Sequence, residues 1–185
     1  TNNGTTVSVG GYQAGAASQI TTFNGYSSSQ IITGVAGNKT NFGALVISNT
    51  YSGGSVTLQS NTELRVNGNL SLLSNTLDDG GQIITVIGNI ENNTTHITTG
   101  SGYLTMASTV GVQTISGNDN GVFGSLTINN SFGVNVTDNI TINNVLTFTT
   151  GKMTISNNLL TFGTTATIGG TPGSTKMIVT NGVLG

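Results

Sequence analysis

The chain contains no cysteine and no tryptophan, and Pro172 is its only proline. Without cysteine, neither a disulfide bridge nor a thiolate metal site can form, so an extracellular chain of this kind needs another source of stability. Proline removes a donor from a β-ladder, and a single proline leaves nearly the whole chain free to form ladders. Pro172 itself lies between glycines and predicts a protruding loop.

Charge is also scarce: charged residues make up 5% of the chain, and the net charge is −2. Neutralising the phosphates of a nucleic acid requires clustered basic side chains, and here the basic side chains are scattered. Nucleic acid is therefore excluded as a partner. The sequence also lacks the run of about 20 apolar residues that a spanning helix needs, so we expect no membrane insertion.

The chain is rich instead in a short motif, an apolar residue, Thr or Asn, and a second apolar residue, often followed by Asn or Gly. Because side chains alternate between the two faces of a strand, the motif predicts a very short strand with its apolar residues on one face. Asn and Gly tolerate the turn conformations that follow. Examples are Leu126-Thr127-Ile128, Ile140-Thr141-Ile142, Leu146-Thr147-Phe148, Met153-Thr154-Ile155 and Leu160-Thr161-Phe162.

The motifs follow one another at intervals of about six to eight residues, which predicts three short strands and about twenty residues per coil. We therefore predict an all-β fold, a right-handed parallel β-helix (β-solenoid). One coil is expected to have strands near Leu126, Val134 and Ile140, and the next near Leu146, Met153 and Leu160. The predicted inward positions are Leu45, Ile47, Val56, Leu58, Leu64, Val66, Leu70, Leu72, Leu126, Ile128, Val134, Val136, Ile140, Ile142, Leu146, Phe148, Met153, Ile155, Leu160 and Phe162.

Two stretches of nearly eighty residues resemble each other. The segment Gly37–Asn49 matches Gly117–Asn129, and Gln30-Ile31-Ile32 precedes the first as Gln113-Thr114-Ile115 precedes the second. A long internal repeat of this kind is typical of solenoids, in which each unit packs on its neighbour.

We accordingly divide one continuous domain into a first solenoid unit over 30–112 and a second over 113–185. Residues 1–29 follow the pattern only loosely and are expected to form an irregular coil or cap. The pattern stops at Gly185 without a polar cap, which suggests a fragment of a longer chain or a subunit whose end a partner covers.

No catalytic residue is predicted. His96 is the only histidine, and among threonines it is expected to be an exposed strand or corner side chain. Asp78-Asp79 is the only acidic pair, and its glycine-flanked position is typical of a turn. A polysaccharide lyase or hydrolase needs convergent acids and is therefore the less favoured function.

The one cofactor that the sequence suggests is Ca²⁺. Asn118, Asp119 and Asn120 form an oxygen-rich loop flanked by glycines, and Ca²⁺ binds oxygen ligands in such loops. The equivalent loop of the first unit carries Lys39 instead of an acid, so the candidate site is not repeated.

The threonines of the motif should face outward on neighbouring coils and form uncharged, hydrogen-bonding faces. Threonine is favourable in strands, so the row can simply solvate the outside. It can also bind carbohydrate, associate with another copy, or bind ice, although Arg65, Asn135 and Lys152 interrupt the rows. The candidate binding residues are Thr127, Thr141, Thr147, Thr154, Thr161 and Thr167.

Three segments, Gln113–Asn118, Phe123–Ser131 and Gly151–Gly163, resemble the repeat modules of large Bacteroidetes cell-surface proteins. The resemblance implies secretion by the type IX system, a location outside the cell, and an adhesive or filamentous role, and it transfers no catalytic residue. We therefore expect a non-enzymatic module of a surface adhesin or fibre. Its expected partners are neighbouring modules or other copies, and polysaccharide or a solid surface. The alternative is a stand-alone ice- or glycan-binding solenoid.

Overall fold

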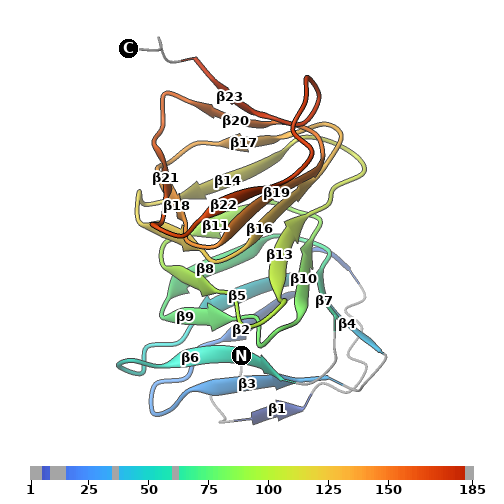
Figure 1. Ribbon diagram of the computed structural model, residues 1–185. Coiled ribbons are helices and arrows are strands. Elements are labelled where there is room, and N and C mark those ends of the chain that lie inside the picture. Colours follow the sequence, from blue (N-terminus) through green and yellow to red (C-terminus); the bar gives the residue numbers. More distant parts are fainter. Residues whose placement is uncertain (1–5, 9–15, 35–37, 60–62, 182–185) are drawn as a thin grey trace.

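The structure is a computed structural model that describes residues 6–8, 16–34, 38–59 and 63–181. In these residues it contains strands, turns and loops and no helix, and the strands form three sheets (Figure 1). Sheet A consists of β2 (Ile20–Phe23), β5 (Ala44–Ser48), β8 (Leu70–Ser74), β11 (Ile90–Asn92), β14 (Gln113–Gly117), β17 (Val134–Val136), β20 (Met153–Ser156) and β23 (Ile178–Thr180).

The other two sheets are built in the same way. Sheet B consists of β1 (Thr6–Ser8), β3 (Gln30–Thr33), β6 (Ser55–Gln59), β9 (Thr76–Asp78), β12 (Thr95–Ile97), β15 (Gly121–Phe123), β18 (Ile140–Ile142) and β21 (Leu160–Phe162). Sheet C consists of β4 (Lys39–Phe42), β7 (Glu63–Val66), β10 (Ile83–Val86), β13 (Tyr103–Met106), β16 (Leu126–Asn129), β19 (Val145–Thr150) and β22 (Thr167–Gly170).

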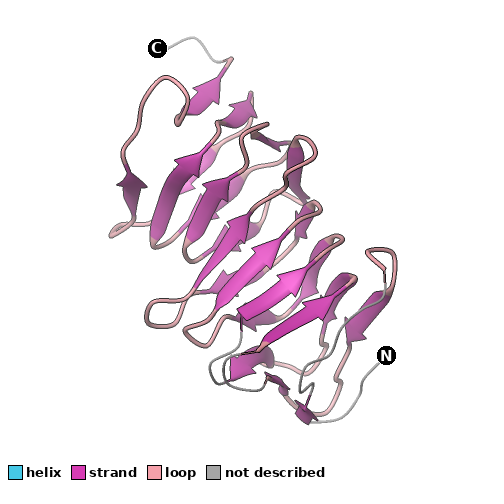
Figure 2. Cartoon of the chain, turned by 90° about the vertical axis from the view of Figure 1, so that its right-hand side faces the viewer, coloured by secondary structure: helices cyan, strands magenta, loops and turns pink. Residues whose placement is uncertain are grey.

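Successive strands from β2 onward belong to different sheets, so that each of them pairs with the one three places along the chain, always in parallel. The chain thus winds through about seven turns of about 21 residues each, and Figure 2 shows the coils stacked along one axis. The prediction of a parallel β-solenoid with three short strands per coil is confirmed. The expected coil falls on β16, β17 and β18, and the next on β19, β20 and β21.

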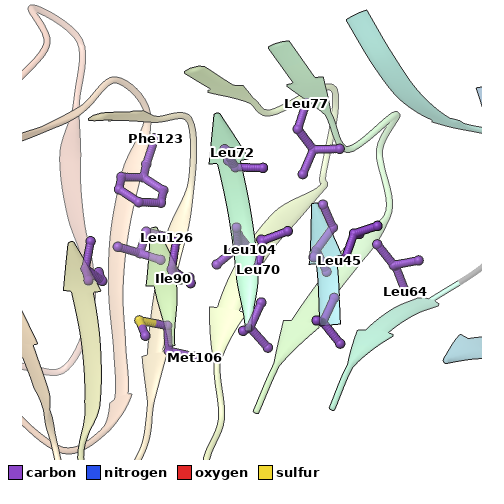
Figure 3. Packing of buried hydrophobic residues seen from close by; sticks show 14 of the residues in the cluster. Leu45, Leu64, Leu70, Leu72, Leu77, Ile90, Leu104, Met106, Phe123 and Leu126 are labelled. Carbon is purple, nitrogen blue, oxygen red and sulfur yellow. The ribbon is translucent and has the colours of Figure 1, made fainter. Parts of the chain in front are cut away.

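The inner side of the three sheets forms one apolar core, in which side chains from successive coils stack on one another (Figure 3). All but three of the predicted inward residues are buried, with exposed fractions of 3% or less. The exceptions, Ile155, Leu160 and Phe162, are partly buried and pack against the core. Leu160 and Phe162 belong to β21, which lies at the edge of sheet B, and Ile155 lies at an irregularity in the pairing of β20 with β23.

Side chains at the corners join one coil to the next. Asn69 Oδ1 accepts the backbone N–H of Asn89 (2.9 Å), and Asn89 Oδ1 accepts that of Thr114 (2.9 Å). At another corner, Asp119 Oδ1 accepts the N–H of Asn139 (2.8 Å), and Asn139 Oδ1 accepts that of Leu159 (2.7 Å). The turn residues that interrupt the ladders therefore bond to the neighbouring coil, so that backbone amides at the corners also find partners.

A buried Gln–Asn pair recurs in both halves of the chain. Gln30 Oε1 accepts hydrogen bonds from the Gly25 amide (2.7 Å) and from Asn49 Nδ2 (3.3 Å). In the second half, Gln113 Oε1 accepts them from the Ser108 amide (2.9 Å) and from Asn130 Nδ2 (3.2 Å). The internal repeat that the sequence indicates is thus also a repeat of hydrogen bonds.

The two copies of this pair do not lie on the same face. Gln30 begins β3 in sheet B, whereas Gln113 begins β14, eleven strands later, in sheet A. Since three strands make one coil, eleven strands fall one strand short of a whole number of coils. Each feature of the second unit therefore lies one sheet away from the same feature of the first unit, as the shift from sheet B to sheet A shows.

The described part of the N-terminal segment joins the ladders. β1 pairs with β3, and β2 pairs with β5, both in parallel. The rest of the expected irregular coil, residues 1–5 and 9–15, lies outside the described residues. At the other end, Pro172 is exposed in the loop between β22 and β23, next to an isolated antiparallel bridge between Gly173 and Lys176.

Candidate binding groove on sheet C

Four threonines form an unbroken row on the outer face of sheet C. Thr85 pairs with Thr105, Thr105 with Thr127, and Thr127 with Thr147, across β10, β13, β16 and β19. Each stands between two apolar residues of the motif, and those residues face the core because side chains alternate along a strand. The sequence pattern on each strand thus places one hydroxyl per coil in register.

The row lies at the bottom of a groove. Two adjoining hollows of about 450 and 350 Å³ lie over β7 to β19, and both are lined by Tyr103, Thr127 and Thr149. Thr85 and Thr105 are only 8% and 7% exposed, although they point outward. We call this feature the sheet-C groove.

Charge is confined to one end of the sheet-C groove, at β7. Glu63 Oε2 lies 2.7 Å from Lys39 Nζ, and Glu63 Oε1 accepts the Thr85 hydroxyl at 3.3 Å. Arg65, which precedes Thr85 in the row, donates its Nε–H to Asn67 Oδ1 at 2.8 Å. From β10 to β19 the residues that line the groove carry no charge.

Thr105 differs from its neighbours in the row. Its side chain is buried, and its Oγ1 has no hydrogen-bond partner in the structure. A buried hydroxyl that loses its bonds to water without replacing them costs about 1–3 kcal/mol. The Thr105 hydroxyl is therefore enclosed by its neighbours and not open to the groove.

The six threonines predicted as a binding face are spread over three sheets. Thr127 and Thr147 belong to the sheet-C row, and Thr167 lies in the adjacent row, opposite Val145. Thr141 and Thr161 pair with each other on sheet B. Thr154 lies on sheet A, opposite Asn135.

The sequence analysis missed several groove residues, among them Thr85, Thr105 and Tyr103. The first two occur in the same motif as the predicted six, as Ile84-Thr85-Val86 and Leu104-Thr105-Met106, so the signal was present. Tyr103 carries no such signal, because its place beside the row follows from the register of β13 against β10.

The candidate Ca²⁺ loop lies at an exposed corner between β14 and β15. Asn118 Oδ1 accepts the backbone N–H of Asn120 (3.3 Å), and Asn120 Nδ2 donates to the Asn118 carbonyl (3.0 Å). The Asp119 carboxylate bonds to the neighbouring coil, as described above. Among the residues that the structure describes, no three His, Asp or Glu side chains gather into a cation site.

His96 is not exposed, and that expectation was wrong. It faces the core from β12, next to Leu77 on β9, and is 1% exposed, whereas Ile97 points outward and is 44% exposed. Its Nε2 lies 3.4 Å from Oδ2 of Asp79, whose side chain is also fully buried. The carboxylate supplies the polar partner that lets a histidine replace an apolar residue inside the coil.

Asp79 is more than a turn residue, because it ties two loops to the core. Its Oδ1 accepts the backbone N–H groups of Gly81 (3.0 Å) and Thr99 (2.9 Å). Burial raises the pKa of Asp79, but the His96 side chain and these two amides outweigh burial and hold the pKa below its ordinary value. Since both side chains of the pair are sealed in the core, we regard it as structural.

No helix in the described part of the chain is long and apolar enough to span a membrane. Comparison with protein-family models, with curated proteins and with solved structures yields no match.

Proposed function

We propose that this chain is a structural and adhesive module of an extracellular surface protein or fibre, which makes contact through the sheet-C groove and catalyses no reaction. The observation that carries the proposal is the row of four threonines at the bottom of a groove that is uncharged from β10 to β19. A rigid, repeating array of hydroxyls is suited to binding a repeating target. The resemblance to surface-protein repeats points to the same role.

The solenoid supplies the mechanical part of this function. All three sheets are hydrogen-bonded along the axis, and the corner side chains of Asn89 and Asn139 each bond to the next coil. A force along the axis is therefore shared by backbone bonds on three faces in every coil. This arrangement suits a stalk or fibre that holds a contact surface away from the cell.

The proposed partners are neighbouring modules of the same chain, other copies, and a polysaccharide or solid surface. The purified chain can be tested for retention on cellulose, mannan, alginate and calcite, and on a column that carries the chain itself. We expect retention on at least one of these, and its loss when Thr127 and Thr147 are replaced by lysine. The outward pair on sheet B, Thr141 and Thr161, provides the matched control.

The Thr141→Lys, Thr161→Lys control should be retained like the wild type. Equal retention of the groove variant and the control, or no retention of the wild type, would contradict the proposal. Incubation with the same polysaccharides should release no soluble sugar, and enzymatic release would contradict the non-enzymatic role.

A further inference from the structure

We infer that the sheet-C groove binds an extended, uncharged polysaccharide chain along the solenoid axis, and that Tyr103 and Thr127 determine its specificity. This inference rests on the proposed function, because it assigns a ligand to the same groove. It goes further in naming the chemical class of the ligand and the residues that select it.

The first argument is the repeat along the groove. The lining residues come from five neighbouring strands, β7, β10, β13, β16 and β19. Parallel strands lie about 4.8 Å apart, so the groove runs for about 19 Å, and the four strands from β10 to β19 each contribute one threonine to its row. A pyranose unit in an extended chain has a similar length. Such a chain can therefore present one sugar to each coil.

The second argument is the chemistry of the lining. Threonine hydroxyls both donate and accept hydrogen bonds, as sugar hydroxyls do. Beyond Glu63, which is engaged by Lys39 and Thr85, the lining has no charge to offset that of a uronic acid or an amine. A charged polymer would lose hydration in the groove without gaining an ion pair, so a neutral one is favoured.

The third argument is Tyr103, the aromatic residue that lines both hollows. Its side chain is half-buried on β13. A fixed tyrosine offers an apolar ring face and a polar tip, and the C–H face of a sugar ring stacks on such a surface. Tyr103 lies where the two hollows meet, so it can hold the middle of a bound chain.

The wall next to Tyr103 is held by the buried pair described above. The turn Gly100-Ser101-Gly102 lines the larger hollow. A Cβ on Gly102 would come within 2.2 Å of Asp79 Oδ1, so glycine is required for this close approach. Asp79 is itself held by Thr99 and paired with His96. The core carboxylate therefore positions one wall of the groove without touching the ligand.

The fourth argument is Thr127, which lines both hollows and is half-buried on β16. Its hydroxyl can donate a hydrogen bond to a sugar hydroxyl and accept one from it. A site built to hydrogen-bond a ligand hydroxyl rejects analogues that lack that hydroxyl. Thr127 is therefore expected to select sugars with a hydroxyl at one position.

Calorimetric titration with hexasaccharides tests the inference. The probes are a β-1,4-glucan, a β-1,4-mannan and an α-1,4-glucan, with a polygalacturonate hexamer as the charged comparison. We expect saturable binding of at least one neutral hexasaccharide and weaker binding of polygalacturonate. Tyr103→Ala should weaken binding about tenfold and Tyr103→Phe much less, because phenylalanine keeps the ring face.

Thr127→Val should weaken binding several-fold, because it removes a groove hydroxyl and keeps the shape of the side chain. The matched control Thr141→Val on sheet B should bind like the wild type. Unchanged melting temperatures and circular dichroism would show that the variants are folded. Absence of binding by every neutral hexasaccharide, or tighter binding of polygalacturonate, would overturn this inference. Groove-dependent retention on calcite or on the chain itself would still support the proposed function, so the two failures are distinguishable.

Discussion

The Asp79–His96 pair shows how one carboxylate can favour which side chain of a strand faces the core. From the pattern alone, the apolar Ile97 is the better candidate for the inward position. The structure places His96 inward instead, beside a carboxylate that also accepts two backbone amides. A pair formed by residues from two different coils cannot be read from the local pattern.

The pair predicts how stability depends on pH. Because the folded state holds the pKa of Asp79 below its ordinary value, the contribution of Asp79 to stability is complete above about pH 4 to 5 and is lost as the pH falls through the folded pKa. We expect Asp79→Asn to lower the free energy of unfolding by about 1–3 kcal/mol at pH 7 and to flatten its acid dependence. Urea denaturation at several pH values measures both effects.

Glu91→Gln is the control for that experiment, because Glu91 is exposed and bonds only to Asn93 Nδ2 among the contacts described. It should keep the wild-type dependence on pH between 3 and 7. If Asp79→Asn were as stable as the wild type at pH 7, the structural role of the pair would be refuted.

Substitution of two glycines with positive φ can distinguish the cost of a steric clash from the cost of backbone strain. Gly151 has φ 86°, and a Cβ there would lie 1.7 Å from the Asn130 carbonyl oxygen. Gly53 has φ 70° but has nothing within 4 Å of the same position. We expect Gly53→Ala to cost about 1 kcal/mol and Gly151→Ala about 3 kcal/mol or more. Chemical denaturation measures both, and equal losses would contradict the close approach at Gly151.

At the scale of the strand, the apolar–Thr–apolar motif specifies which side chains enter the core. Ile142 is fully buried on β18, and its neighbour Thr141 points outward. Ile142→Asn should lower the free energy of unfolding by about 3–5 kcal/mol, because it removes core packing and buries an amide. Thr141→Asn should cost less than about 1 kcal/mol. Comparable melting temperatures for the two variants would show that the register is wrong.

The same motif explains why the fold was predictable and the groove was not. Apolar alternation and Asn or Gly at the corners occur in every coil, so the three strands and the core follow from local sequence. The motif is the same on all three sheets, however, and does not tell which face a threonine joins. Thr127 and Thr141 look alike in sequence, yet one lies in the groove of sheet C and the other on sheet B.

At the scale of the whole molecule, the position of the threonine row at the bottom of a groove distinguishes between two repeating targets, ice and a polysaccharide. Ice offers a flat surface, which can reach only a flat, exposed row, whereas Thr85 and Thr105 lie almost fully buried below the edges of the groove. We expect no thermal hysteresis in nanolitre osmometry at millimolar protein. A measurable hysteresis that Thr127→Lys abolishes would contradict the groove as a polysaccharide site.

The eleven-strand step between the two halves has a consequence for any longer array of such units. Each added unit would present the features of its predecessor one side further round, and every third unit would look in the original direction. Equivalent binding surfaces would thus follow a helical path around the rod. Partners could then attach to such a rod on each of its three faces.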